Sequence, residues 1–217
     1  MEQRIELANN LNVLRFTCTK CGKCCKDPNT FINVTYHDIL RLRKGLKLSL
    51  EEILEVIGFY TFSKVNIEKF MSQMVYAPIQ TEQGLAFIGL LKKQDSRCTF
   101  LGEDDTCTIY EHRPAICRTF PFTFLMSEDG KKITNKIGYT KKGIDYCPGI
   151  KKTAPIVKKK KIGIKLTTSL AEIASDAKMV ESWNKMVENK QIQPKAAKYI
   201  ASILLMEDKL KEEKSHN

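Results

Sequence analysis

The spacing of apolar residues predicts two amphipathic helices early in the chain, because each set recurs every three to four positions. The two sets comprise Ile39, Leu42 and Leu46, and then Leu50, Ile53, Leu54 and Ile57. Each set follows a capping-box pattern, Thr35–Asp38 for the first and Ser49–Glu52 for the second, which favours a helix start there. A third short helix is expected over Ile67–Met71.

Shorter apolar runs separated by turn residues predict β-strands in the middle of the chain. The expected strands are Val75–Ile79, Leu85–Leu91, Cys98–Leu101, Thr106–Tyr110 and a hairpin from Phe122 to Tyr139. Gln83-Gly84 and Asp129-Gly130 are turn signals between these runs. The central region is expected to close at Cys147-Pro148-Gly149.

Helical spacing returns after a linker rich in lysine and proline, Lys151–Lys161. The apolar stripe of this segment consists of Leu170, Ile173, Ala174, Ala177, Val180, Met186 and Val187. Ser169–Glu172 has the pattern of another capping box, and Pro194 suits the first turn of a last helix. Two helices in succession predict a helical hairpin at the end of the chain.

Composition restricts the class of protein. Hydrophobic residues make up 42% of the 217 residues, so the chain can bury a core. No apolar run approaches the ~18–20 residues of a membrane span, and the first residues lack the apolar stretch of a secretion signal. We therefore expect a cytoplasmic protein. In that reducing compartment its eight cysteines, a small fraction of the chain, are not expected to form a disulfide framework.

The basic excess lies mainly in the last third of the chain. The formal net charge is +11, and residues 151–217 supply +7 of it, from 15 lysines against 8 acidic residues. A polyanionic partner such as nucleic acid is one interpretation. A general preference for lysine is the other, since lysine outnumbers arginine 29 to 7. The absence of arginine from this segment does not favour base-specific reading.

The cysteines are the residues with the most distinctive chemistry. Four stand within eight positions and four are spread over the next segment: Cys18, Cys21, Cys24, Cys25, Cys98, Cys107, Cys117 and Cys147. A Cys-x2-Cys turn brings two sulfurs to one side, and thiolates select zinc, Cu(I) or iron–sulfur clusters. Cations that flank the cysteines help to hold the thiolate form. These cations are Lys20, Lys23, Lys26, Arg97, Arg113 and Arg118. For the three arginines the alternative is an ordinary ion pair with Asp104, Asp105 or Glu111, and both roles can hold at once.

The kind of metal follows less directly from the spacing. A repeated Cys-x2-Cys begins the bacterial ferredoxin pattern, in which a Cys-Pro also supplies a ligand, so Cys147-Pro148 is a candidate remote ligand. Zinc, which favours paired Cys-x2-Cys motifs, is the alternative. Eight thiols suffice for two four-cysteine sites, and the adjacent Cys24 and Cys25 are expected to point apart. His112 is interpreted as a structural histidine.

These motifs together resemble the CxxCxxCC family of zinc- or iron-chelating domains. The matching segments are the run Cys18–Cys25, Cys98-Thr-Phe-Leu101, the stretch Cys107–Pro121 and Cys147-Pro-Gly149. The resemblance implies metal chelation, with all eight cysteines in matched motifs. The flagellin lysine N-methylases look like relatives through a similar cysteine signature. That analogy implies protein lysine modification with S-adenosylmethionine as one activity.

The expected protein is therefore a cytosolic metal-binding protein with an iron–sulfur cluster, of the 4Fe–4S type, and a redox or protein-modifying role. The alternative is a zinc-stapled binding module that uses its lysine-rich segment on nucleic acid or an acidic partner. The expected fold is α+β, with a small antiparallel sheet and helices around a cysteine metal centre, followed by a C-terminal helical hairpin. The expected domains are a cysteine-rich metal-binding domain, 1–150, and a basic helical extension, 151–217. Catalytic residues and the identity of a protein or redox partner are not assigned.

Overall fold

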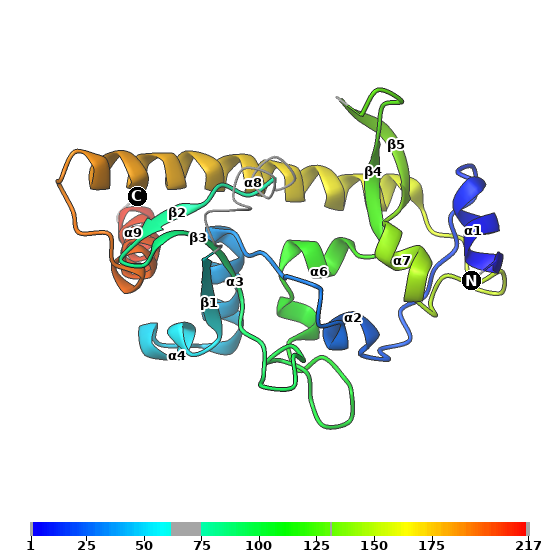
Figure 1. Cartoon of the computed structure of the whole chain (residues 1–217), viewed down its shortest axis with the longest axis horizontal. Helices are drawn as coiled ribbons and strands as arrows, with labels where there is room; N and C mark the ends of the chain where they lie inside the picture. Colours follow the sequence, from blue (N-terminus) through cyan, green and yellow to red (C-terminus); the bar gives the residue numbers. More distant parts are fainter. Residues whose placement is uncertain (1, 62–74, 131, 216–217) are drawn as a thin grey trace. The chain divides into compact units, whose positions relative to one another are not determined.

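A computed structural model describes residues 2–61, 75–130 and 132–215 (Figure 1). The chain forms two compact units, each built from three separate segments. Unit 1 consists of Met1–Thr30, Gln94–Tyr110 and Ala115–Leu170, and unit 2 of Phe31–Lys93, Glu111–Pro114 and Ala171–Asn217. All eight cysteines belong to unit 1. The expected division at residue 150 stays a prediction.

Unit 2 begins with the two helices that the apolar spacing predicts. Helix α3 (Tyr36–Leu46) buries Ile39 and Leu42, and helix α4 (Leu50–Leu54) buries Ile53. Both capping boxes are present, because the side chain at each N-cap and the carboxylate three residues later exchange hydrogen bonds with the backbone. These local signals therefore fix where both helices start.

A three-stranded antiparallel sheet follows in unit 2. Its strands are β1 (Ile57–Thr61), β2 (Ile79–Thr81) and β3 (Gly84–Leu90), in the order β1-β3-β2. The helical assignment of Ile57 is wrong, because this residue pairs with Leu90 in the sheet. Pairing with a buried neighbouring strand outweighs the local helical spacing. The expected strand Val75–Ile79 is reduced to its last residue, and the expected helix Ile67–Met71 lies outside the described residues.

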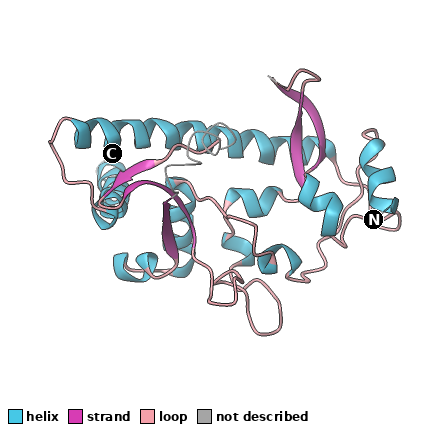
Figure 2. Ribbon diagram, in the orientation of Figure 1, coloured by secondary structure: helices cyan, strands magenta, loops and turns pink. Residues whose placement is uncertain are grey.

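Two long helices end the chain, which confirms the C-terminal helical region of the expected α+β fold (Figures 1 and 2). They are α8 (Lys159–Glu188) and α9 (Ala196–Ser215). In unit 2 the ring of Trp183 packs edge-on against Tyr199 with centroids 5.1 Å apart, and its indole N–H donates to the Gln80 carbonyl. The expected helix start at Ser169 is wrong. This residue lies inside α8, because the preceding lysines continue the helix upstream.

Unit 1 contains short helices and one hairpin. The helices are α1 (Glu2–Asn9), α2 (Lys23–Lys26), α6 (Ala115–Thr119), α7 (Lys141–Tyr146) and the first part of α8. Strands β4 (Phe122–Met126) and β5 (Ile133–Tyr139) form the predicted hairpin. The expected strands Cys98–Leu101 and Thr106–Tyr110 are wrong. These segments form turns joined by one bridge, Leu101↔Cys107, because hydrogen bonds within the segment hold a compact loop.

The apolar core of unit 1 is small and includes a cysteine. Its buried members are Leu14, Phe122, Tyr139, Cys147, Ile150 and Leu166. The Tyr139 hydroxyl donates to the Arg15 carbonyl over 2.9 Å, which ties the hairpin to the N-terminal segment. No helix in the described ranges is long and apolar enough to cross a membrane.

Candidate metal centre

The first cysteine loop owes its shape to two left-handed residues. Lys20 and Gly22, on either side of Cys21, have φ values of 52° and 65°. A Cβ atom at Gly22 would lie 2.6 Å from the backbone oxygen of Asp105, so only glycine allows this close approach. The turn leads into α2, where the Cys25 N–H donates to the Gly22 carbonyl over 2.8 Å. The first cysteine loop thus packs against the turn that follows Leu101.

Cys24 and Cys25 lie side by side within α2. Their sulfurs are 3.9 Å apart, so the expectation that they point apart is wrong. The side chains of successive residues in a one-turn helix can lean toward each other. Sulfurs at tetrahedral positions around one zinc ion, with bonds of ~2.3 Å, would be separated by about 3.8 Å. This pair of thiols therefore has a spacing compatible with a shared metal.

A second group of thiols surrounds Cys25. The Cys98 N–H donates to the Cys25 carbonyl over 2.8 Å, which joins the first cysteine loop to the middle segment of unit 1. The hydrogen bond with Cys24 raises the pKa of the Cys25 thiol, and burial and the charges of Cys24, Cys98 and Cys117 raise it further. Cys117 lies on α6, which begins directly after Pro114, a residue type that suits the start of a helix. Cys25, Cys98 and Cys117 are therefore electrostatic neighbours.

Cys147 approaches the first loop from the other end of the sequence. It is the C-cap of α7, and the Thr17 N–H donates to the Gly149 carbonyl over 3.1 Å. A Cβ atom at Gly149 would lie 2.3 Å from the Thr17 oxygen, so the Cys-Pro-Gly turn needs its glycine. Burial raises the pKa of Cys147, and the charges of Cys21 and Cys24 add to the effect. The turn that carries Cys147 thus lies directly beside the chain that leads to Cys18.

The remaining two cysteines lie in the same segments as the others. Cys18 is exposed at the start of the first loop, and Cys107 pairs its backbone with Leu101. None of the eight cysteines, all of which the structure describes, is in a disulfide bond. Among the residues that the structure describes, no three His, Cys, Asp or Glu side chains already stand in positions to hold one ion together. The donor set fits a thiophilic metal by its chemistry, since it consists entirely of thiols gathered in one unit.

Several flanking cations have partners of their own. Lys26 pairs with Asp105 at 2.5 Å, and Arg97 pairs with Asp95 at 2.5 Å. The ammonium group of Lys20 lies 4.9 Å from the ring centroid of Tyr110. The ion pair of Lys26 with Asp105 was not predicted, and Arg97 pairs with Asp95 rather than with Asp104, Asp105 or Glu111. These contacts hold the cysteine segments in place and keep positive charge beside them.

Two further residues of the site were not predicted. Lys142 on α7 binds Asp27 at 2.7 Å and the Thr30 hydroxyl at 2.6 Å, which connects α7 to the end of the first loop. Burial opposes ionisation of Asp27, but the bonds from Lys142 and Thr30 prevail and lower its pKa to about 2. No local pattern links two residues so far apart in sequence.

His112 packs on α3 in unit 2, since a Cβ at Gly45 would lie 2.3 Å from its ring.

Comparison with known proteins identifies the class. The model of the CxxCxxCC family, described as "Putative zinc- or iron-chelating domain", matches residues 17–148. The chain therefore belongs to this family, and the matched region contains every cysteine.

The chain also resembles an archaeal protein in sequence. The uncharacterized protein MJ0661 of Methanocaldococcus jannaschii is 26% identical over 150 residues, which cover 68% of this chain. The match spans 65% of the relative's own length. No solved structure matches the chain significantly.

Proposed function

We propose that Cys18, Cys21, Cys24 and Cys147 ligate an iron–sulfur cluster in a cytoplasmic protein. The observation that carries this proposal is the position of the Cys-Pro-Gly turn. Its Gly149 carbonyl accepts from Thr17, one residue before Cys18, and Cys147 has Cys21 and Cys24 as electrostatic neighbours. Three closely spaced cysteines and one remote Cys-Pro are the ligand pattern of ferredoxin-type clusters.

The other four cysteines form a second thiolate site in this proposal. Cys25, Cys98 and Cys117 are electrostatic neighbours, and Cys107 lies in the turn whose backbone pairs with Leu101. The distance of 3.9 Å between the Cys24 and Cys25 sulfurs supports an arrangement in which the two proposed sites are neighbours. A single zinc ion is the alternative occupant of either set, and the chelating chemistry of the family admits both metals.

Apolar residues shield the Cys147 side of the proposed cluster from water, whereas Cys18 is exposed. When bound, an iron–sulfur cluster supplies one-electron transfer, and its potential depends on burial and on hydrogen bonds to its sulfurs. Cys147 lies in the apolar cluster of unit 1, beside Phe122 and Ile150. Lys20 and Lys26 keep positive charge near the first loop, which favours the anionic thiolates. A redox role therefore takes precedence over the lysine-modifying role, which rests on the methylase analogy alone.

The test is anaerobic purification of the full chain, followed by absorption spectroscopy and analysis of iron, zinc and sulfide. We expect visible absorption from iron–sulfide charge transfer and several irons and sulfides per chain. Cys147→Ser should abolish the spectrum of the first site, and Cys107→Ser should leave it in place while lowering total metal. A colourless protein with stoichiometric zinc would exclude the cluster. Equal loss of all metal in both variants would exclude two separate sites.

A further inference from the structure

The first part of α8 carries an unusual charge distribution. Residues 159–170 contain four lysines and no acidic residue, whereas residues 171–188 contain four acidic residues and two lysines. Cations at the amino end of a helix face the positive end of its dipole, which is unfavourable. Within the described residues, the lysines of this first part have no carboxylate partner. The amino-terminal end of α8 therefore lacks the negative charge that would balance it.

Two of these four lysines border a groove in unit 1. The groove has a volume of about 700 Å³ and runs between the start of α8, the β4–β5 hairpin and the segment after α1. Lys159 and Lys160 line it from α8, and Lys136 lines it from β5. The Lys159 ammonium donates to the Leu11 carbonyl, which fixes one cation at the rim. A groove of this size is within the range of ligand sites, ~300–1,000 Å³.

The floor of the groove is apolar and partly aromatic. Phe124 and Ile137 form the hairpin side, and Gly163 leaves the helix side open. A Cβ at Gly163 would be 3.5 Å from the Ile137 side chain, so the two elements are in close contact there. Asn12 and Asn135 add amide groups that can donate and accept hydrogen bonds. Of the residues that the structure describes, no acidic one lines the groove.

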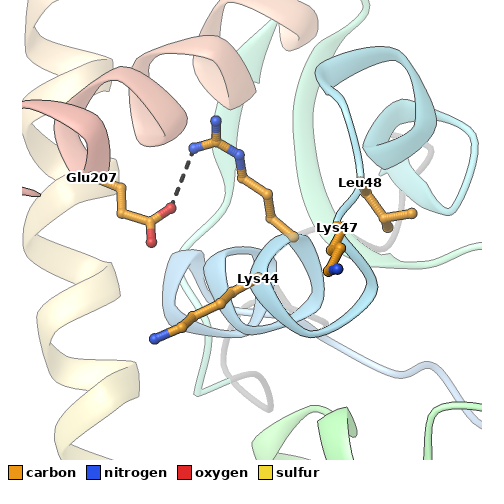
Figure 3. A pocket seen from close by; sticks show the side chains of 5 residues that line it. Lys44, Lys47, Leu48 and Glu207 are labelled. Atoms are coloured by element: carbon orange, nitrogen blue, oxygen red, sulfur yellow. Dashed lines mark hydrogen bonds and ion pairs between the residues drawn. The ribbon is translucent and has the colours of Figure 1, made fainter.

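Another pocket, in unit 2, differs from this groove in its charges. It has a volume of about 320 Å³ in unit 2 and is lined by Arg43, Lys44, Lys47, Leu48 and Glu207 (Figure 3). There the guanidinium of Arg43 binds Glu207 at 3.2 Å and Asp208 at 3.1 Å. Carboxylates of the protein itself thus pair with Arg43 at that pocket, while the charged residues that line the groove of unit 1 are all lysines.

We propose that the groove of unit 1 binds single-stranded nucleic acid. Its three lysines supply positive charge for phosphates, its Phe124 supplies an aromatic side chain for stacking with a base, and its asparagines supply donors and acceptors for base edges. This combination of a cationic channel with an aromatic platform is how proteins bind single strands without strong sequence preference. Poly-glutamate would satisfy the lysines but has no planar ring to stack on the phenylalanine. Among the described residues, the lining of the groove includes none of the eight cysteines.

The experiment measures binding of a fluorescein-labelled ten-nucleotide thymidine oligomer to the metal-loaded full chain by anisotropy. Contacts with three phosphates predict a slope of log K against log salt of about −2. The double variant Lys159→Glu/Lys160→Glu should weaken binding more than tenfold and flatten the slope. The matched control is Lys161→Glu/Lys165→Glu, which makes the same charge change on exposed positions of α8 outside the groove. It should change affinity less than threefold.

Two further variants test the groove without a change of charge. Phe124→Leu removes the stacking surface and should weaken binding at least fivefold. Gly163→Leu should block the floor, and circular dichroism will show whether each variant folds. Equal weakening by both lysine pairs, or equal affinity for poly-glutamate or for a duplex of the same length, would overturn the proposal. Absence of binding at 50 mM salt would overturn it as well.

Discussion

The two units are stabilised in different ways. Nine of the twelve largest fully buried side chains lie in unit 2, among them Tyr199, Phe87 and Ile39, and only Leu14, Leu101 and Ile150 lie in unit 1. Unit 1 instead holds all eight cysteines, several of them in turns with little regular structure. A unit with a small core and many thiols depends on its metal, whereas a unit with a full apolar core does not. The comparison therefore predicts separate responses to the same treatment.

Metal removal should have the largest effect and should divide the molecule. Structural metal sites of thiolates contribute on the order of 10 kcal/mol to folding, so unit 1 should unfold when a chelator extracts the metal. Strands β1, β2 and β3 of unit 2 should keep their amide protection. Hydrogen exchange with mass spectrometry measures both units in one sample. Equal loss of protection in both units would show that the core of unit 2 is not sufficient for its stability.

Truncation of a core residue in unit 2 should destabilise unit 2 and leave the metal bound in unit 1. Phe87 is 1% exposed, and Phe87→Ala should lower the free energy of unfolding of unit 2 by about 3–5 kcal/mol through the cavity it leaves. Leu85→Ala is the matched control, because Leu85 lies on the same strand and is 37% exposed. Denaturant titration and metal analysis check both variants. Loss of metal from the Phe87 variant would show that the units are not independent.

A smaller effect is expected from a buried carboxyl group in unit 2. Burial raises the pKa of Asp176 to about 7, although the Tyr36 N–H donates to this carboxyl over 2.7 Å and favours its ionised form. The charge of Asp38 raises the pKa further. The folded protein therefore binds the proton more tightly than the unfolded chain. Stability should fall as pH rises from about 4 to about 7, by at most about 4 kcal/mol.

Asp176→Asn should remove this pH dependence, because the amide oxygen can still accept from Tyr36 and carries no charge. The variant should gain stability relative to the parent at pH 8 and lose that advantage at pH 5. Glu181→Gln is the control, since Glu181 is an exposed residue of the same helix paired with Lys185. Denaturation midpoints at the two pH values measure the difference. An unchanged slope in the Asp176 variant would contradict the assignment.

The local features of the fold were predictable from the sequence. Both capping boxes act within four residues, and the β4–β5 hairpin has its Asp129-Gly130 turn signal, so neighbours in sequence determine them. Features that depend on distant partners were missed. Ile57 was assigned to a helix because its pairing with Leu90 cannot be read from spacing.

The candidate site divides in the same way. The eight cysteines were identified from their spacing, but their neighbours were not. The contact of the Cys147 turn with Thr17 joins residues more than a hundred positions apart, and the bond from Lys142 to Asp27 is similar. The closeness of Cys24 and Cys25 depends on side-chain orientation in a single helical turn, which the sequence does not specify. The sequence thus predicts which residues are candidate metal ligands, but it does not predict which of them lie close together.

The insertion of most of unit 2 between Cys25 and Cys98 has a consequence for the order of assembly. To bring these cysteines together, an unfolded chain must close a loop of more than seventy residues, at an entropic cost of about 4 kcal/mol. Within unit 2, however, the segment at Ile32–Val34 exchanges backbone hydrogen bonds with Ile88 and Leu90, near the two ends of the insertion. Once unit 2 has folded, that long loop is already closed. Only the short stretches of chain between unit 2 and each of these cysteines then remain to be ordered when the metal binds.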